Sequence, residues 1–197
     1  MKHDWIIVYE TAMQYFESHE FILAKDCIDE VLKHPNALLE PEVMLYAAGI
    51  YYSAPQETNP LSEYYADENI VDIESILNGK FKKVIDFAKA GLNIKKVKGF
   101  VKLELLKYEI DAYYQQSKKL FQLIIDCLEI NSVDIKSMGL KCYELVQKAK
   151  KCFDKMNENE RGIHDPEKIS NLKQEILEKR LFTAMEWTEY KKINGLL

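Results

Sequence analysis

The sequence is poor in the residues that interrupt helices and shape tight loops. Seven glycines and five prolines are spread over 197 residues, and runs that alternate polar with apolar residues are almost absent. A phosphate-binding loop needs several glycines close together, and a half-buried strand needs that alternation. A glycine-rich nucleotide site and a β-sheet fold are therefore both disfavoured, and an all-α protein is expected.

Features that particular function classes require are missing as well. No apolar run approaches the roughly 20 residues of a membrane span, and Trp5–Val8 is too short for the core of a signal peptide. We therefore expect a cytoplasmic protein without membrane contact. The motifs HExxH and GxSxG do not occur, and the four histidines are scattered. The sequence thus predicts no enzyme, no catalytic residue, no metal site and no cofactor.

The cysteines are few and widely spaced. Cys27, Cys127, Cys142 and Cys152 form no CxxC pair and have no histidine at zinc-site spacing. Each lies on the apolar side of a predicted helix, where free cysteine behaves as a small hydrophobic residue. We expect four buried, reduced thiols.

The most informative stretch runs from Tyr9 to Pro35 and contains two apolar stripes separated by three polar residues. In the first stripe, Ala12 is followed at helical spacing by aromatic side chains. The second stripe recurs every three or four residues and consists of Phe21, Ala24, Ile28, Val31 and Leu32. The pattern predicts two antiparallel helices joined by a tight turn at Ser18–Glu20 and ended by His34-Pro35.

This hairpin resembles a tetratricopeptide repeat, whose period is about 34 residues. The family alternates small, aromatic and large apolar residues before a closing proline, and the matching residues here are Ala12, Tyr15, Phe21, Ala24, Ile28 and Pro35. The departures are Val8 at the family's early tryptophan, Ala12 at its glycine, and a proline about one position early. The resemblance implies further hairpins stacked on the first.

A second copy of the pattern is interrupted, and a third is weaker. The two halves of the second copy are Ala48, Gly49 and Tyr52, followed by Phe81, Val84, Ala88, Gly91 and Leu92. Between them lies an acidic insertion at 53–79, whose end reads as a short helix stopping at Asn78-Gly79. The third pair would consist of Tyr108, Asp111 and Tyr114, followed by Leu120, Leu123 and Leu128.

The expected architecture is all-α, with stacked antiparallel hairpins in a tetratricopeptide-like solenoid and a C-terminal capping helix. The expected domain parts are hairpins over 1–156, a linker at 157–166, and a last helix within 167–197 packed on the same domain. Val97–Ile130 reads as one long helix or as two with a break at Gln115–Ser117. Met138–Phe153 reads as an amphipathic helix. The alternative fold is an irregular helical bundle with chance matches to the repeat.

Charge is divided into two blocks. The segment His34–Gly79 holds eight carboxylates and no basic residue except His34, whereas Lys80–Lys107 holds nine lysines and two carboxylates. The blocks either neutralise each other across a solvated surface, which we favour, or steer a partner of opposite charge. Nucleic acid is disfavoured because the whole chain has a net charge of −5 and only two arginines.

The resemblance implies a protein or peptide partner, held in a groove lined by the first helix of each hairpin. The candidate partner-binding residues lie on those helices and in the insertion: Met13, Gln14, Glu17, Tyr46, Tyr51, Tyr64 and Tyr65. The tyrosine pair of the insertion either contacts a partner or packs the loop on its own hairpin. The expected function is an interaction module or adaptor. Three alternatives stay open. The first is a small secretion chaperone or assembly factor of the same repeat family, and the second is an effector or enzyme on a helical bundle. The third is a regulatory helical sensor domain that binds a short peptide or a second protein and relays a conformational shift.

Overall fold

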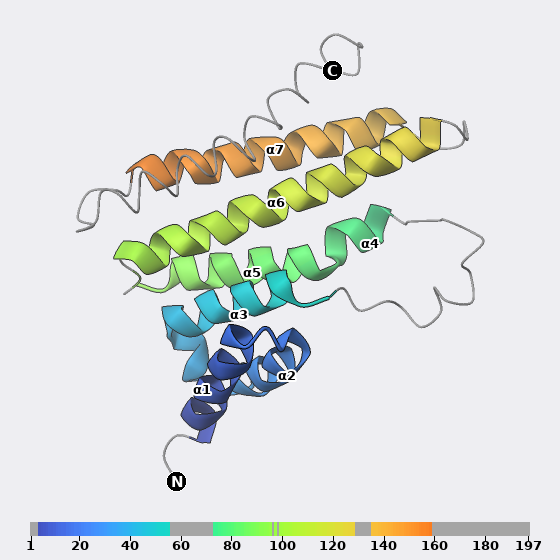
Figure 1. Ribbon diagram of the computed structural model, residues 1–197. Helices are drawn as coiled ribbons and strands as arrows, with labels where there is room; N and C mark the ends of the chain where they lie inside the picture. Colours follow the sequence, from blue (N-terminus) through green and yellow to red (C-terminus); the bar gives the residue numbers. More distant parts are fainter. Residues whose placement is uncertain (1–3, 56–72, 96, 98, 129–134, 159–197) are drawn as a thin grey trace, which may run out of the picture. The chain divides into compact units, whose positions relative to one another are not determined.

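The structure, a computed structural model, describes residues 4–55, 73–95, 97, 99–128 and 135–158 (Figure 1). The chain divides into two compact units, Met1–Val97 and Lys98–Leu197, which we describe separately. All regular structure in the described residues is helical, so the all-α prediction is confirmed for them. The first unit contains α1 (Asp4–Glu17), α2 (Phe21–Val31), the 3-10 turn η1 (Ala37–Leu39), α3 (Pro41–Ser53), α4 (Ile73–Asn78) and α5 (Lys80–Asn93).

The predicted hairpin is present as α1 and α2. Ala12 and Ala24 are both fully buried, which allows the two helices to pack closely. His19 adopts a left-handed conformation with φ of 63°, and its backbone N–H donates to the Phe16 carbonyl at 3.1 Å. The Glu20 N–H donates to the Tyr15 carbonyl at 2.8 Å. These paired bonds form a Schellman motif, so α1 ends through backbone geometry at a residue other than the usual glycine.

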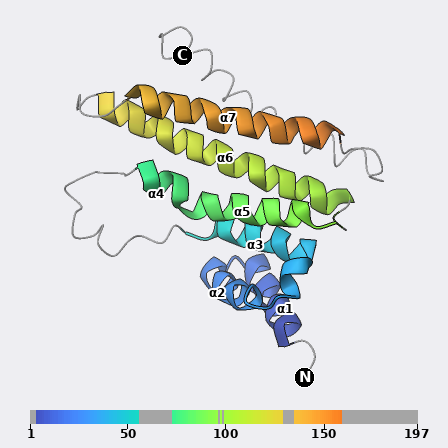
Figure 2. The ribbon, with the colours of Figure 1, turned by 180° about the vertical axis from the view of Figure 1, so that it is seen from behind.

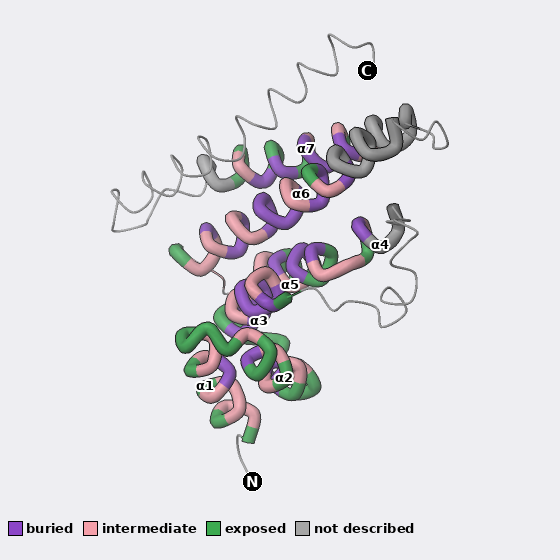
Figure 3. The backbone as a smooth tube through the Cα atoms, turned by 45° about the vertical axis from the view of Figure 1, so that its right-hand side comes forward, coloured by how far each residue is buried: buried purple, intermediate pink, exposed green. Residues whose placement is uncertain are grey.

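Helix α3 is the central helix of the first unit. It contacts η1, α1, α2 and α5, and most of its length is buried, as Figure 3 shows. Pro41 occupies the first turn of α3, where proline's fixed φ and missing N–H fit the helix start. α3 and α5 lie side by side in Figures 1 and 2. Ala48 and Ala88 are fully buried in these two helices, and the Tyr52 and Phe81 rings meet edge-on at 5.9 Å.

The predicted acidic insertion is described only at its two ends. Ser53 is the last residue of α3, and α4 ends at Asn78, which confirms the predicted short helix with its stop at Asn78-Gly79. Tyr64 and Tyr65 lie outside the described residues.

The described part of the second unit consists of two long helices, α6 (Gly99–Leu128) and α7 (Ile135–Glu158), which pack side by side. Because α6 is a single helix, both halves of the proposed third repeat lie on one helix, and the prediction of a hairpin there is wrong. The break considered at Gln115–Ser117 does not occur. Gln116 and Ser117 are buried, and the Ser117 hydroxyl donates to the Tyr114 carbonyl at 2.8 Å within the helix.

Helix α7 confirms the predicted amphipathic helix and extends beyond it at both ends. It continues to Glu158, so the first two residues of the predicted linker at 157–166 are helical; the rest of that linker and the predicted last helix lie outside the described residues. Cys142 and Cys152 are buried on α7, and the Cys142 thiol donates a hydrogen bond to the Ser117 carbonyl at 3.4 Å. Cys27 is free but only partly buried, which corrects its predicted burial. The side chain of Cys127 is not described.

The Tyr9 hydroxyl gives the first unit a pH dependence. The Tyr9 ring meets Tyr46 edge-on at 5.7 Å. Burial raises the pKa of Tyr9 well above its usual 10.0, with smaller contributions from Tyr46 and the Glu42 carboxylate. Because the folded pKa is the higher one, this contribution to stability is complete below about pH 10 and is lost as the pH rises further.

We therefore expect the free energy of unfolding to fall more steeply above about pH 10 in the wild type than in Tyr9→Phe, which has no proton to lose at this position. Urea titrations followed by circular dichroism on both sides of that pH measure the two slopes. Equal slopes would contradict the prediction, because the two proteins share every other tyrosine and lysine.

Candidate functional site

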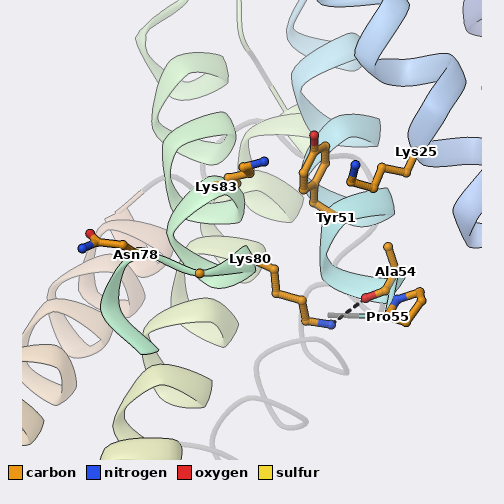
Figure 4. A pocket seen from close by; sticks show the side chains of 8 residues that line it. Lys25, Tyr51, Ala54, Pro55, Asn78, Lys80 and Lys83 are labelled. Carbon is orange, nitrogen blue, oxygen red and sulfur yellow. Dashed lines mark hydrogen bonds between the residues drawn. The ribbon is translucent and has the colours of Figure 1, made fainter. Parts of the chain in front are cut away.

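A pocket with a cavity volume of about 180 Å³ opens on the first unit (Figure 4). Its walls come from α2, the C-terminal end of α3, the α4–α5 junction and the first turn of α5. The residues that line it are Lys25, Tyr51, Ala54, Pro55, Asn78, Gly79, Lys80 and Lys83. Three of these are lysines and none is acidic.

Helix packing gathers these lysines from distant positions in the sequence. Lys80 and Lys83 are three residues apart on α5, a spacing that places two side chains on the same side of a helix. Lys25 lies on α2, and its ammonium reaches the same pocket because α2 and α5 both pack against α3. Two of the three lysines, Lys25 and Lys83, flank the ring of Tyr51 on α3.

The Tyr51 ring is held between two cations. The ammonium nitrogens of Lys25 and Lys83 lie 5.3 Å and 5.1 Å from the centre of the ring, and Figure 4 shows the ring standing between them. The Tyr51 hydroxyl donates a hydrogen bond to Asp29, whose other carboxylate oxygen accepts one from Lys25 at 3.2 Å. Since Tyr51 is only 5% exposed, its ring is a fixed surface that positions both ammonium groups.

Lys80 joins the end of α3 to the start of α5. Its ammonium donates to the backbone carbonyl of Tyr52 at 3.0 Å. It also donates to the carbonyl of Ala54 at 2.8 Å, just past the C-terminal end of α3 (Figure 4). A cation at a helix C-terminus is favourable because the last carbonyls lack partners in their own helix. Lys80 is also the first residue of α5, so this contact fixes that wall of the pocket.

Among the described residues that line the pocket, the charged ones are all lysines. Asp29 offsets part of the charge of Lys25, but it does not line the pocket. The first turn of α5 contains no acidic residue, and Gly79 at its N-cap supplies no side-chain cap. The partial positive charge of the helix start therefore adds to the field of the lysines. This arrangement can hold an anionic group.

The described members of the predicted partner-binding set do not gather at this pocket. Gln14 and Glu17 are exposed on α1 and Met13 is partly buried there, but none of the three lines the pocket. Tyr46 packs edge-on against Tyr9 and Phe16, at 5.7 Å and 6.2 Å, and so helps to join α1 to α3. Of the predicted set, Tyr51 lines the pocket.

The sequence pattern alone does not predict the three pocket lysines as a site. Lys80 and Lys83 lie at the start of the basic block Lys80–Lys107. The charge pattern of the sequence therefore indicates the segment that holds two of the three pocket lysines. Lys25 is remote in sequence and sits beside Asp29, so its spacing is typical of an ordinary helical ion pair.

Two further classes of site were sought in the described residues. No group of histidine, cysteine, aspartate or glutamate side chains there has the arrangement of a metal centre. No helix in the described part of the chain combines the length and apolar character needed to span a membrane.

Comparison of the chain with protein-family models, curated proteins and solved structures found no match.

Proposed function

We propose that this chain is a protein-interaction module that captures an acidic segment of a partner protein at the lysine pocket. The observation that carries the proposal is the arrangement of the Lys25 and Lys83 ammonium groups about the buried ring of Tyr51. A fixed aromatic ring flanked by cations offers both contact area and charge, which protein interfaces favour.

The size of the pocket supports a side chain as the bound group. Its volume of about 180 Å³ is below the roughly 300–1,000 Å³ of pockets that enclose drug-sized ligands. One or two acidic side chains of a longer segment fit this space, and the rest of the segment would lie across the neighbouring surface.

The resemblance of the α1–α2 hairpin to a tetratricopeptide repeat also supports a binding role, because that family usually recognises peptides. On that resemblance, Met13, Gln14 and Glu17 stay candidates for a second contact region on α1. Tyr64 and Tyr65 keep the same standing in the insertion. The lysine pocket is the better-supported site because its lysine side chains favour a negatively charged group.

The test is a peptide-display selection against the full chain, followed by affinity measurements on the enriched peptides. We expect enrichment of Asp and Glu. The double substitution Lys25→Glu and Lys83→Glu should weaken binding by roughly tenfold or more, because each charged contact is worth about 1.5–3 kcal/mol. Binding should also weaken as salt is added.

The matched control is Lys150→Glu with Lys151→Glu on α7. Both lysines are exposed, and the change in net charge is identical. Equal affinity losses in the two double variants would show a general charge effect and contradict the pocket as the site. Alanine substitutions at Gln14 and Glu17 test the α1 region in the same assay.

A further inference from the structure

We infer that Asp29 is a built-in competitor of the acidic partner segment, and that its carboxylate lowers the affinity of the pocket by holding the Lys25 ammonium. This inference rests on the proposed function and concerns the regulation of the same site. Its evidence is the position of the Asp29 carboxylate, which accepts hydrogen bonds from Lys25 and Tyr51, two of the residues that line the pocket.

The two lysines that flank the Tyr51 ring are held differently. The Lys25 ammonium lies 3.2 Å from an Asp29 carboxylate oxygen, and the Lys25 side chain is only 21% exposed. Lys83 is exposed on α5, and its ammonium lies over the other face of the Tyr51 ring (Figure 4). An acidic side chain that approaches Lys25 therefore meets the charge of Asp29 directly beside it.

Asp29 is fixed by contacts from two helices. One carboxylate oxygen accepts a hydrogen bond from the Tyr51 hydroxyl of α3, and the other accepts from Lys25 of α2. Because Tyr51 is only 5% exposed, its hydroxyl is held in place by packing. The negative charge of Asp29 therefore stays next to Lys25 when a second carboxylate arrives.

The effect of Asp29 on binding is the difference between two opposing contributions. The ion pair restrains the Lys25 side chain, but a partly exposed pair at i,i+4 spacing contributes little. Two carboxylates that share one ammonium repel each other, and this repulsion is stronger at a protein surface than in bulk water. The Tyr51 ring, 5.3 Å from the Lys25 ammonium, still orients it when the charge of Asp29 is removed. Neutralising Asp29 should therefore strengthen the binding of an acidic segment.

The experiment measures the affinity of the full chain for the acidic peptides enriched in the selection, by fluorescence anisotropy. Asp29→Asn removes the charge and keeps an oxygen that can accept the hydrogen bond of the Tyr51 hydroxyl. We expect this variant to bind the peptides roughly threefold or more tightly than the wild type. The matched control is Asp26→Asn, at an exposed aspartate of the same helix, with the identical change in net charge and a smaller expected gain.

A double-mutant cycle tests whether the gain acts through Lys25. In a Lys25→Gln background, Asp29→Asn should improve binding no more than Asp26→Asn does. In a Lys83→Gln background, the additional gain from Asp29→Asn should remain. Circular dichroism checks the folding of each variant, and Asp29→Ser is the second neutral variant if Asp29→Asn is poorly folded.

The outcomes separate this inference from the proposed function. If acidic peptides bind but Asp29→Asn and Asp26→Asn give equal gains, the effect is one of general charge and the competition is wrong. Weaker binding by Asp29→Asn would show that Asp29 positions Lys25 for the ligand, which also overturns the inference. In both cases acidic-segment binding stands. If neither the wild type nor Asp29→Asn binds acidic peptides, the proposed function fails and this inference fails with it.

Discussion

Replacing Ile28 with alanine should lower the free energy of unfolding of the first unit by about 2–5 kcal/mol. Ile28 is fully buried on α2, in a unit where α2 packs against both α1 and α3. The substitution removes three buried carbon atoms and leaves a cavity that close-packed helices fill only partly. The loss is large because a domain of this size is expected to be stable by only about 5–15 kcal/mol.

The chain offers a matched control on the same helix. Ile22 is 63% exposed, so Ile22→Ala makes the same chemical change with an expected effect within about 0.5 kcal/mol. The two tryptophans are Trp5 and Trp187. In a Trp187→Phe background, the fluorescence of Trp5 on α1 reports the unfolding of the first unit during urea titration. Similar losses for Ile28→Ala and Ile22→Ala would contradict the burial described for α2.

The second large effect is expected from Ala88→Leu, which should cost about 1–3 kcal/mol through overpacking. Ala88 is fully buried on α5, and Ala48 is fully buried on the neighbouring α3. A leucine side chain at position 88 would force α5 away from α3 or into strained rotamers. Because α5 carries Lys80 and Lys83 while α3 carries Tyr51, such a displacement should also weaken anion binding at the pocket.

Ala90→Leu is the control for this change. Ala90 lies two residues further along α5 and is exposed, so a larger side chain there meets solvent. The same Trp5 fluorescence assay and the peptide-binding assay apply to both variants. If Ala88→Leu were as stable as Ala90→Leu and bound peptide equally well, the close packing of α3 on α5 would be wrong.

Local sequence patterns predict the first hairpin because the apolar spacing and the polar turn both indicate two helices. The spacing of Ala12, Ala24 and Ile28 defines buried helical faces, and three polar residues separate them. The closing signal was less accurate. Pro35 was expected to end the second helix, but α2 already stops at Val31, and Pro35 falls in the turn before η1. The residue before a proline avoids helical geometry, yet nothing obliges a helix to continue up to it.

In the second unit, polar residues suggest a helix break that the structure does not contain. Gln115–Ser117 looked like a helix break because three polar residues follow an apolar stripe. In the structure Gln116 and Ser117 are buried in α6, and the Ser117 carbonyl accepts a contact from Cys142 of α7. The burial of these polar side chains depends on which residues of α7 pack against them. The sequence of α6 alone does not contain that information.

The pocket was only partly visible in the sequence for a related reason. The sequence predicts Tyr51 as a partner-binding residue, and the basic block indicates the start of α5. Lys25 joins them through the packing of three helices, a relation between positions far apart in the chain. Local spacing describes neighbours on one helix, so it could not assemble this site.

The contacts of Lys80 have a consequence for engineering. By holding the Tyr52 and Ala54 carbonyls from the first position of α5, this side chain keeps Pro55 and Gly79 anchored on one rim. Once two anchor points are fixed, each doubling of the chain between them costs only about 0.6 kcal/mol in closure entropy. A longer segment inserted between Pro55 and Ile73 should therefore lower the free energy of unfolding of the first unit by little more than that amount for each doubling.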